Sequence, residues 1–377
     1  MQMRFVHISD LHIGKKLKER SLEEDQRHIL GQILSIIDDV SPDAVLIAGD
    51  VYDTSSPTIE SVRMLDWFLT ELSTRDLDTF MIAGNHDSAD KLGFGSRIFE
   101  KNRLFISGVF SGTMDRHRVV RGEEVVDVYL LPFIKPINVR RFHPDEDVES
   151  YEDAVRIAIA GTEVPDGVPK VLVTHQFIVS GSHGPDLSDS ESSFVGGTES
   201  VDCSVFDGFD YVALGHIHGP QRIGRDTVRY CGTPLKYSLS EKDHVKSVTV
   251  VDICSGHVTV DTVPLTPLRD LRQIRGPLEE LIEAGKGDPD SDDFIYVQLE
   301  GDSMDAMARL REVYPNVMSL EVVGRDHVFE QVSDVDIERV DLVELFGEFF
   351  ENRVGRPMTE KQKQIVRELM DDGEGIL

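Results

Sequence analysis

The chain has 377 residues and contains 39 Lys and Arg against 69 Asp and Glu, which gives a formal net charge of −30. This acidity argues against a protein that binds nucleic acid or anionic membranes, because Lys and Arg are needed to meet phosphate groups. It leaves a metal enzyme open, since carboxylates bind divalent cations. Hydrophobic residues make up 40% and charged residues 29%, which is typical of a soluble globular protein with two or three domains.

The sequence predicts neither a membrane span nor a secretion signal. No apolar segment approaches the roughly 20 residues that a membrane-spanning helix needs. The first residues, MQMRFVHISD, contain no apolar signal segment and lead directly into a strand-like pattern. The cysteines, Cys203, Cys231 and Cys254, form no CxxC pair and are typical of reduced thiols. We therefore expect a cytoplasmic protein that does not enter a membrane.

Short β-branched segments alternate with helical patterns in the first part of the chain. Helices are predicted over residues 22–40 and 59–73, where apolar residues recur at helical spacing. The predicted strands cover residues 4–8, 44–48, 79–83, 125–131, 170–174 and 210–214. Alternation of this kind indicates an α/β layer fold with buried strands.

The rest of the chain predicts a second sheet, a small module and a helical end. The strands of the second sheet cover residues 228–231, 247–253 and 257–263. A boundary falls over residues 264–277, where prolines interrupt the strands. The module beyond it contains a loop over 285–293, strands over 294–299 and 319–323, and a helix over 303–313. We divide the chain into domains of residues 1–268, 269–337 and 338–377.

The last domain is predicted to be helical. One apolar stripe recurs at i, i+3, i+4 and i+7 and consists of Leu342, Leu345, Phe346 and Phe349. Pro357 interrupts the pattern, and Thr359 with Gln362 forms a capping box that starts a final helix. A stripe of this kind usually packs on its own domain, but it also suits docking into the groove of a partner.

Five short polar motifs each follow a predicted strand. They are Asp10-Leu11-His12, Gly49-Asp50-Val51-Tyr52-Asp53, Gly84-Asn85-His86-Asp87, Thr174-His175 and Gly215-His216-Ile217-His218. In α/β sheets the carboxyl ends of the strands share one edge, where ligand sites form, so we expect the five motifs to meet. A glycine before the acid, the amide or the imidazole lets the chain turn sharply off the strand.

The residue types in these motifs indicate a metal site. Asp, His and Asn supply the ligands that manganese, iron or zinc bind, and the lack of cysteine disfavours a structural zinc site. A single strand-end His or Asp is usually a core, surface or turn residue, but chance does not account for five such motifs in order. The donors suffice for two metals, and two metals about 4 Å apart can hydrolyse a phosphate ester. Asp53, Asp87 and His7 are interpreted as groups that orient the ligands.

At these motifs the sequence resembles the calcineurin-like metallophosphoesterase superfamily, whose pattern is DxH, GDxxD, GNH[DE], a lone histidine and GHxH. More narrowly it resembles the SbcD family, the nuclease subunits of bacterial SbcCD complexes and relatives of the Mre nucleases. The narrower resemblance rests on residues 7–14 (HISDLHIG), 49–57 (GDVYDTSSP), 215–221 (GHIHGPQ) and 230–241 (YCGTPLKYSLSE). The last stretch has no metal role that its residues suggest, so it distinguishes the family rather than the chemistry.

The resemblance implies a ligand set and a catalytic residue. The first metal would bind Asp10, His12, Asp50 and His218. The second metal would bind Asp50, Asn85, His175 and His216, with Asp50 as the bridge. His86 would stabilise the transition state or protonate the leaving oxygen. The family typically works with Mn²⁺, and because the histidine ligands must be neutral we expect activity to fall below roughly pH 6.

The resemblance also implies an architecture and a partner. The fold would be a four-layer sandwich, in which two central β-sheets are flanked by helices, with a small α+β capping domain that contacts DNA. The C-terminal helices would dock on an SbcC-type ATPase in a heterotetramer, and a homodimer of the nuclease domain is compatible with it. Four cations after the first motif are candidates for DNA contact, unless they form a solvated loop: Lys15, Lys16, Lys18 and Arg20.

The implied function is a manganese-dependent nuclease of DNA repair, recombination and replication. It would act on double-stranded ends as a 3′→5′ exonuclease and on single strands and hairpins as an endonuclease. A phosphatase or cyclic-nucleotide phosphodiesterase on the same fold is the alternative enzyme, and a non-catalytic module that recruits the ATPase to DNA ends is a third hypothesis.

The acidity is concentrated toward the end of the chain. Residues 286–377 contain 10 Lys and Arg against 23 Asp and Glu, whereas residues 1–285 contain 29 against 46. The inference from the net charge therefore applies to the isolated chain only. We expect this chain alone to bind DNA weakly, with an affinity that falls steeply as salt increases. The partner would supply much of the electropositive surface.

Overall fold

The computed structural model describes residues 2–191, 199–301, 305–323, 358–359 and 361–363. Contacts divide the chain into two compact units, Met1–Val323 and Gly324–Leu377. The predicted apolar stripe of Leu342, Leu345, Phe346 and Phe349 lies outside the described residues. The predicted capping box lies within them, because Thr359 N donates to Gln362 Oε1 at 3.0 Å and Gln362 N donates to Thr359 Oγ1 at 3.4 Å.

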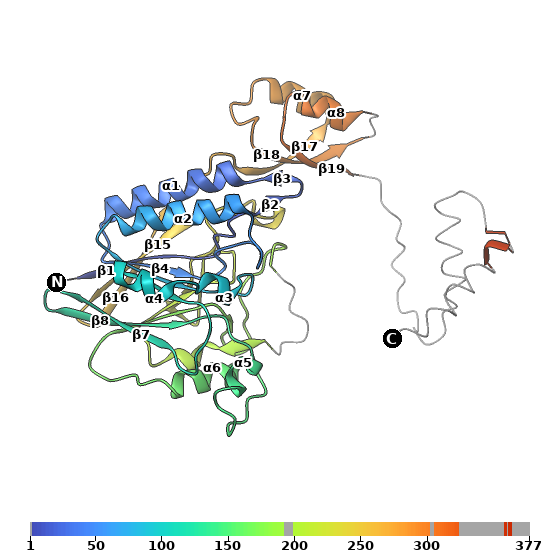
Figure 1. Cartoon of the computed structure of the whole chain (residues 1–377). Coiled ribbons are helices and arrows are strands. Elements are labelled where there is room, and N and C mark those ends of the chain that lie inside the picture. Colours follow the sequence, from blue (N-terminus) through green and yellow to red (C-terminus); the bar gives the residue numbers. More distant parts are fainter. Residues whose placement is uncertain (1, 192–198, 302–304, 324–357, 360, 364–377) are drawn as a thin grey trace. The chain divides into compact units, whose positions relative to one another are not determined.

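The first unit contains two six-stranded sheets (Figure 1). The order of the first sheet is β16-β15-β1-β4-β5-β6, in which β1, β4, β5 and β6 are parallel and β15 and β16 are antiparallel. Its strands are β1 (Met3–Ile8), β4 (Ala44–Ala48), β5 (Asp78–Ile82), β6 (Leu104–Ser107), β15 (Ser247–Cys254) and β16 (His257–Pro264).

The second sheet has the order β13-β14-β12-β9-β8-β7, with a parallel centre from β14 to β8 and antiparallel edges. Its strands are β7 (Asp115–Arg121), β8 (Glu124–Leu131), β9 (Lys170–Thr174), β12 (Tyr211–Leu214), β13 (Gln221–Ile223) and β14 (Arg225–Tyr230). Two short pairs stand apart from the large sheets: β2 (Lys16–Leu17) with β3 (Arg20–Ser21), and β10 (Phe177–Val179) with β11 (Ser200–Asp202).

Helices cover the outer faces of both sheets. Long helices α1 (Glu23–Val40) and α2 (Ile59–Ser73) lie on the first sheet, and α5 (Pro136–Arg140) and α6 (Tyr151–Ala160) lie on the second (Figure 1). Short helices of the sandwich are α3 (Ala89–Leu92), α4 (Ser96–Phe99), η1 (Glu100–Asn102), η2 (Cys203–Phe206) and η3 (Leu239–Glu241). The predicted four-layer sandwich is confirmed.

The layers explain why the strands are apolar throughout rather than alternating. In β4, Val45 and Ile47 pack against the helical layer, whereas Leu46 and Ala48 point into the core between the two sheets. Successive side chains of a strand face opposite sides, so a strand covered on both faces must be apolar at every position. The two sheets are thereby fixed face to face with their strand ends at a common edge.

The predicted α+β module is present as a three-stranded parallel sheet with two helices. Its elements are β17 (Leu271–Pro277), α7 (Leu278–Lys286), β18 (Phe294–Glu300), α8 (Ala306–Arg311) and β19 (Val317–Val323). The module has a core of its own, in which Leu281 and Leu310 pack against Ile295 and Val297. The division at residues 268/269 and 337/338 stays a prediction.

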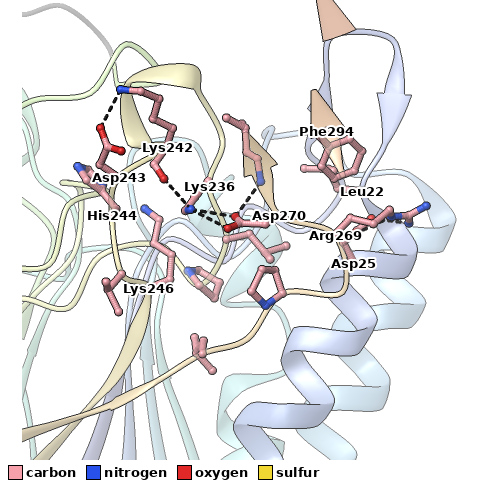
Figure 2. Close-up of a pocket in the computed structure, with 16 residues that line it drawn as sticks. Leu22, Asp25, Lys236, Lys242, Asp243, His244, Lys246, Arg269, Asp270 and Phe294 are labelled. Carbon is pink, nitrogen blue, oxygen red and sulfur yellow. Dashed lines mark hydrogen bonds and ion pairs between the residues drawn. The ribbon is translucent and has the colours of Figure 1, made fainter. Parts of the chain in front are cut away.

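A cavity of about 290 Å³ lies where the module joins the sandwich (Figure 2). Arg269 donates to Asp25 of α1 at 2.6 Å, and Lys236 lies 2.9 Å from Asp270 on the opposite side. Phe294, the first residue of β18, contributes an apolar wall. The junction therefore combines ion pairs with apolar contacts from both parts.

Two observations on the described residues concern their helices and their cysteines. None of the helices among them is long and apolar enough to cross a bilayer. Cys203, Cys231 and Cys254 are all free thiols, of which only Cys231 is buried.

The core between the sheets offers a test of this architecture. Leu46 is fully buried there, so Leu46→Ala should lower the free energy of unfolding by about 2–5 kcal/mol through lost burial and a residual cavity. Val245→Ala is the matched control, because that side chain is 71% exposed and its loss should change stability by less than about 0.5 kcal/mol. Urea unfolding in EDTA measures both, and equal effects would contradict the assigned layer.

Candidate metal centre

The five predicted motifs converge at the common edge of the two sheets. Asp10, Asp50 and Asn85 follow β1, β4 and β5, which are neighbouring parallel strands of the first sheet. His175 and His216 follow β9 and β12, which are neighbours in the second. The loops are tied together by their backbones, since the amide of Asp10 donates to the carbonyl of Gly49 at 3.0 Å. Side chains from residues 10 to 218 thus meet in one place.

The backbone at this edge is strained. Asp10, His12, Asp50 and His216 have positive φ angles of 52°, 42°, 46° and 105°, which non-glycine residues rarely adopt. Such angles turn the chain back at the end of a strand and aim the side chain at the neighbouring loops. Four of the predicted ligands therefore have a strained backbone. Such strain persists only where the surrounding structure holds the residue in place, and it is common at functional sites.

The glycines of the motifs serve close packing more than turning. Only Gly49 among Gly49, Gly84 and Gly215 has a positive φ, of 85°. A Cβ on Gly84 would overlap the Oδ1 atom of Asp50, and a Cβ on Gly215 would overlap the carbonyl oxygen of Ala48. The predicted reason, a sharp turn, is therefore right for Gly49 and wrong for the other two.

Asp10, His12 and His218 form the first group of metal-ligating atoms, which all lie within 4.8 Å of one another. The Nε2 atoms of His12 and His218 are 3.2 Å apart. The other ring nitrogen of His12 lies 3.4 Å from Asp53, and that of His218 lies 2.7 Å from the Ser190 hydroxyl. If both outer nitrogens bear hydrogen, two Nε2 lone pairs face each other, and such a pair is stable only with a cation or a proton between them. The donors therefore fit a metal ion.

Asp50 and His175 form the core of the second group, together with Asn85 and His216. His175 Nε2 lies 3.3 Å from Asp50 Oδ2 and 3.0 Å from Asn85 Oδ1, and His216 Nδ1 lies 2.9 Å from the same amide oxygen. His175 Nδ1 is 2.7 Å from the carbonyl oxygen of Ala48, to which it donates. The carboxylate of Asp50 also lies 3.8 Å from His12 of the first group. Its place between the groups fits the predicted bridge.

Burial and mutual charge shift the pKa values of these residues in opposite directions. Burial raises the pKa of Asp10 to about 7. Burial alone would raise the pKa of Asp50, but the charge of His175 outweighs it and holds that pKa well below its usual range. In return, Asp50 outweighs the effect of burial and raises the pKa of His175 to about 9. Burial lowers the pKa of His216 to about 3 and that of His218 to about 4.

His86 lies beside the two groups and is partly exposed. Its Nδ1 is 2.9 Å from the carbonyl oxygen of Asp53, and its Nε2 is 4.0 Å from Asp50 Oδ2. The ring packs edge-on against His12 with centroids 4.9 Å apart. One ligand atom each of His86, His12 and Asp50 lie within 4.8 Å of one another, so the structure brings His86 to the site.

The three residues interpreted as orienting groups have different surroundings. Asp53 lies 2.8 Å from Lys15 Nζ, and its Oδ1 lies 3.4 Å from His12 Nδ1. Asp87 accepts from the backbone amides of Val51, Tyr52 and Gly84 at 2.9–3.1 Å and so joins two ligand loops. His7 points into the core between the sheets, where its Nδ1 is 2.9 Å from the Tyr211 hydroxyl. His7 therefore links the two sheets.

Several residues at the site were not predicted. Gln26 donates to the carbonyl oxygen of His12 at 2.7 Å, and the Tyr237 hydroxyl donates to that of Leu11 at 2.7 Å. The half-buried carboxylate of Glu191 accepts from the amide of His218 at 2.6 Å, and partial burial raises its pKa to about 7. The signal that could have found Tyr237 is the family-specific stretch 230–241.

Three of the four candidate DNA-contact cations are engaged within the chain. Lys15 pairs with Asp53, as described above. Lys18 Nζ donates to the carbonyl oxygen of Met318 at 3.0 Å, and Arg20 donates to that of Pro315 at 2.7 Å, so the β2–β3 hairpin is attached to the α+β module. Lys16 is exposed. Of the four, Lys16 is the one whose charge has no contact with another described residue.

Comparison with known proteins identifies the family. A family model for calcineurin-like phosphoesterases matches residues 3–220, more than half of the chain. The chain is also 33% identical over 383 residues to the SbcD subunit of nuclease SbcCD from Staphylococcus epidermidis, across 99% of this chain and 100% of the relative. The chain belongs to the calcineurin-like phosphoesterase family, in its SbcD branch. The predicted resemblance is confirmed.

Further matches concern the end of the chain and solved structures. A model described as the type 5 capsule protein repressor C-terminal domain matches residues 267–354 of this SbcD-type chain. A dimetal phosphatase from Danio rerio has 12% identity and a TM-score of 0.40, covering 71% of this chain and 98% of its own. TT1561 of Thermus thermophilus has 11% identity and a TM-score of 0.39, covering 70% and 99%.

The raised pKa values predict that metal binding releases protons. At neutral pH the metal-free site holds a proton on His175 and part of one on Asp10, and a cation must displace both. A raised His175 pKa stabilises the metal-free fold below about pH 6.5 and stops doing so as pH rises through about 9. The increase in Tm that Mn²⁺ gives over EDTA should therefore grow from pH 6.5 toward 9.

Calorimetry measures the released protons directly. Titration of Mn²⁺ in buffers of different ionisation enthalpy should give heats that depend on the buffer. Heats that are independent of the buffer, or a Tm increase that shrinks with pH, would contradict this assignment.

Proposed function

We propose that the protein is the nuclease subunit of an SbcCD-type complex and hydrolyses DNA phosphodiesters with two divalent cations. The supporting observation is the convergence of the seven predicted ligands at one sheet edge, in a chain that aligns over 99% of its length with the SbcD subunit of nuclease SbcCD. We propose Mn²⁺ as the metal. Carboxylate, amide and imidazole donors suit it, and thiolates are absent from the described site.

The residues of the chain divide the chemistry between them. Asp50, between the two groups, and the neutral His216 and His218 would hold the cations, which when bound activate water and hold a phosphoryl oxygen. His86 would act as the doubly protonated ring: its Nδ1–H donates to the carbonyl oxygen of Asp53, its Nε2–H would pass to the leaving oxygen, and water would return that proton after each cycle. Asp53 would keep His12 oriented through its Nδ1.

The proposal also covers the substrates of the nuclease, its partner and its location in the cell. The substrates would be DNA ends and hairpins, cut by 3′→5′ exonuclease and by endonuclease activity during repair, recombination and replication in the cytoplasm. The SbcC-type ATPase would bind the C-terminal residues 338–377 through the stripe of Leu342, Leu345, Phe346 and Phe349. Residues 269–337 would serve as the DNA-contacting cap, and Lys16 is the cation best placed to meet a phosphate.

Cleavage of blocked DNA ends tests the nuclease assignment. The chain is purified with its cognate ATPase, and an end-blocked duplex is incubated with Mn²⁺, with and without ATP. We expect cutting that requires Mn²⁺ and both subunits and that rises with ATP. Asp50→Asn, which weakens the proposed bridge, should abolish it and is the control for contaminating nuclease.

A phosphatase or cyclic-nucleotide phosphodiesterase is the alternative that the same geometry supports. Bis-p-nitrophenyl phosphate and 3′,5′-cyclic AMP are assayed beside plasmid, hairpin and linear DNA. Turnover of a small ester with no cutting of any DNA would replace the nuclease by this alternative.

His86 provides the mechanistic test. His86→Ala should lower the cleavage rate by about 10²- to 10⁴-fold, as expected for a lost general acid, while Mn²⁺ stoichiometry and ATPase binding are retained. His257→Ala, an exposed histidine at the start of β16, is the matched control and should cut normally. Retained binding with lost cutting would also reject the non-catalytic recruitment module, whereas normal cutting by His86→Ala would remove His86 from the mechanism.

A further inference from the structure

Glu241 is a buried carboxylate in the family-specific stretch 230–241, for which the sequence suggested no metal role. It is the last residue of η3, and its side chain is fully buried. A buried carboxylate is stable only when it is paired and hydrogen-bonded. Lys246, which is 5% exposed and lines the cavity of Figure 2, places its Nζ 2.5 Å from Glu241 Oε2.

The other oxygen of Glu241 is equally occupied. Oε1 accepts from the Ser190 hydroxyl at 2.5 Å, from the Ser238 hydroxyl at 3.0 Å and from the amide of Tyr237 at 3.2 Å. With Lys246 on one oxygen and three donors on the other, the carboxylate has a single orientation. An ionised carboxylate only accepts hydrogen bonds, so the hydroxyl hydrogen of Ser190 points to Glu241.

The hydrogen bond from Ser190 to Glu241 determines which ring nitrogen of His218 bears hydrogen. Ser190 Oγ lies 2.7 Å from His218 Nδ1. Since the hydroxyl hydrogen points to Glu241, Ser190 can only accept from His218, which must therefore have hydrogen on Nδ1. The lone pair of Nε2 is then directed toward Asp10 and His12, the first group of ligands.

The same network also holds the backbone of His218. The carbonyl oxygen of His218 accepts from Lys246 Nζ at 3.0 Å and from the amide of Thr233 at 3.1 Å. Its amide donates to Glu191, as described above. Ring and main chain are therefore fixed together. In the second group, by contrast, His175 is oriented directly by the carbonyl oxygen of Ala48.

We propose that Ser190 and Glu241 are positioning residues for His218, which set its tautomer and direct its Nε2 atom to one of the two cation sites. The inference rests on the proposed function, since it assigns His218 to a cation. We call the hydrogen bonds from Glu241 through Ser190 to His218 the Ser190–Glu241 relay. Loss of this relay should weaken cation binding at the site that contains His218 and should leave the affinity of the site that contains His175 unchanged. Loss of a group that orients a metal ligand typically costs about 10–100-fold in metal affinity.

Ser190→Ala tests the relay with the least disturbance, because the Glu241–Lys246 pair remains. Titration of the metal-free full-length chain with Mn²⁺ alone, followed by calorimetry and electron paramagnetic resonance, should show two sites in the unaltered chain. In Ser190→Ala one site should weaken by about 10- to 100-fold and the other should keep its affinity. Ser190→Thr, which restores a hydroxyl, should recover the affinity.

Controls separate positioning from folding. Asp243→Asn removes an exposed carboxylate two residues from Glu241 and should bind Mn²⁺ as the unaltered chain does. Glu241→Gln should weaken the same site as Ser190→Ala, and if it does not fold, Ser190→Ala still decides. Two Mn²⁺ sites of unaltered affinity in Ser190→Ala, or equal weakening of both, would overturn the proposal.

A second readout is independent of cation binding and of nuclease activity. Imidazole ¹⁵N spectra of the metal-free chain should show hydrogen on His218 Nδ1, and Ser190→Ala should lose this preference. Hydrogen on Nε2 alone in the unaltered chain would overturn the relay. Failure of the proposed function would instead appear as absent Mn²⁺ binding or absent DNA cleavage in the unaltered chain, with the Nδ1 preference still present.

Discussion

The carboxylate of Asp50 lies at the end of β4 with 3% of its side chain exposed, between two sheets whose facing sides are apolar. A charge in such a place is stable only if nearby groups supply opposite charge and hydrogen bonds. His175 from the second sheet supplies the charge, and the amide of His86 donates to Oδ1 at 2.9 Å. These partners come from different sheets. The need of the buried Asp50 carboxylate for opposite charge and hydrogen bonds therefore determines how the sheets stack and which loops lie together.

The ligands could be predicted because each is joined to a strong local signal. Asp10, Asp50 and His175 directly follow apolar strands, and parallel strands bring their ends together whatever the detailed packing. Ser190 and Glu241 follow no strand and lie far from His218 in sequence, so their hydrogen bonds arise only from tertiary structure. The role of Glu241 was hidden because the sequence shows neither its burial nor its pairing.

The fold could also be predicted only where the sequence carries a strong local signal. Strands buried on both faces, such as β4 and β12, read as continuous apolar segments. The edge strand β7 (DRHRVVR) was missed because its side chains are largely polar, and α6 was missed because it is short and its buried positions include two alanines. β17, the first strand of the module, lies among prolines and arginines that indicated a boundary. The two module strands that were recognised, β18 and β19, are mostly apolar.

The β2–β3 hairpin attaches the module in a way that bears on how the family can diverge. Lys18 and Arg20 donate hydrogen bonds to the carbonyl oxygens of residues 318 and 315, and Lys18 Nζ also lies 5.4 Å from the centre of the Tyr296 ring in β18. Every amino acid provides a carbonyl oxygen, so the two hydrogen bonds place no demand on the identity of residues 315 and 318, whereas the ring contact of Lys18 needs an aromatic residue at position 296. Residues 315 and 318 can therefore change in evolution, and with them this part of the module surface, without loss of the hydrogen bonds that hold the hairpin beside the metal ligands.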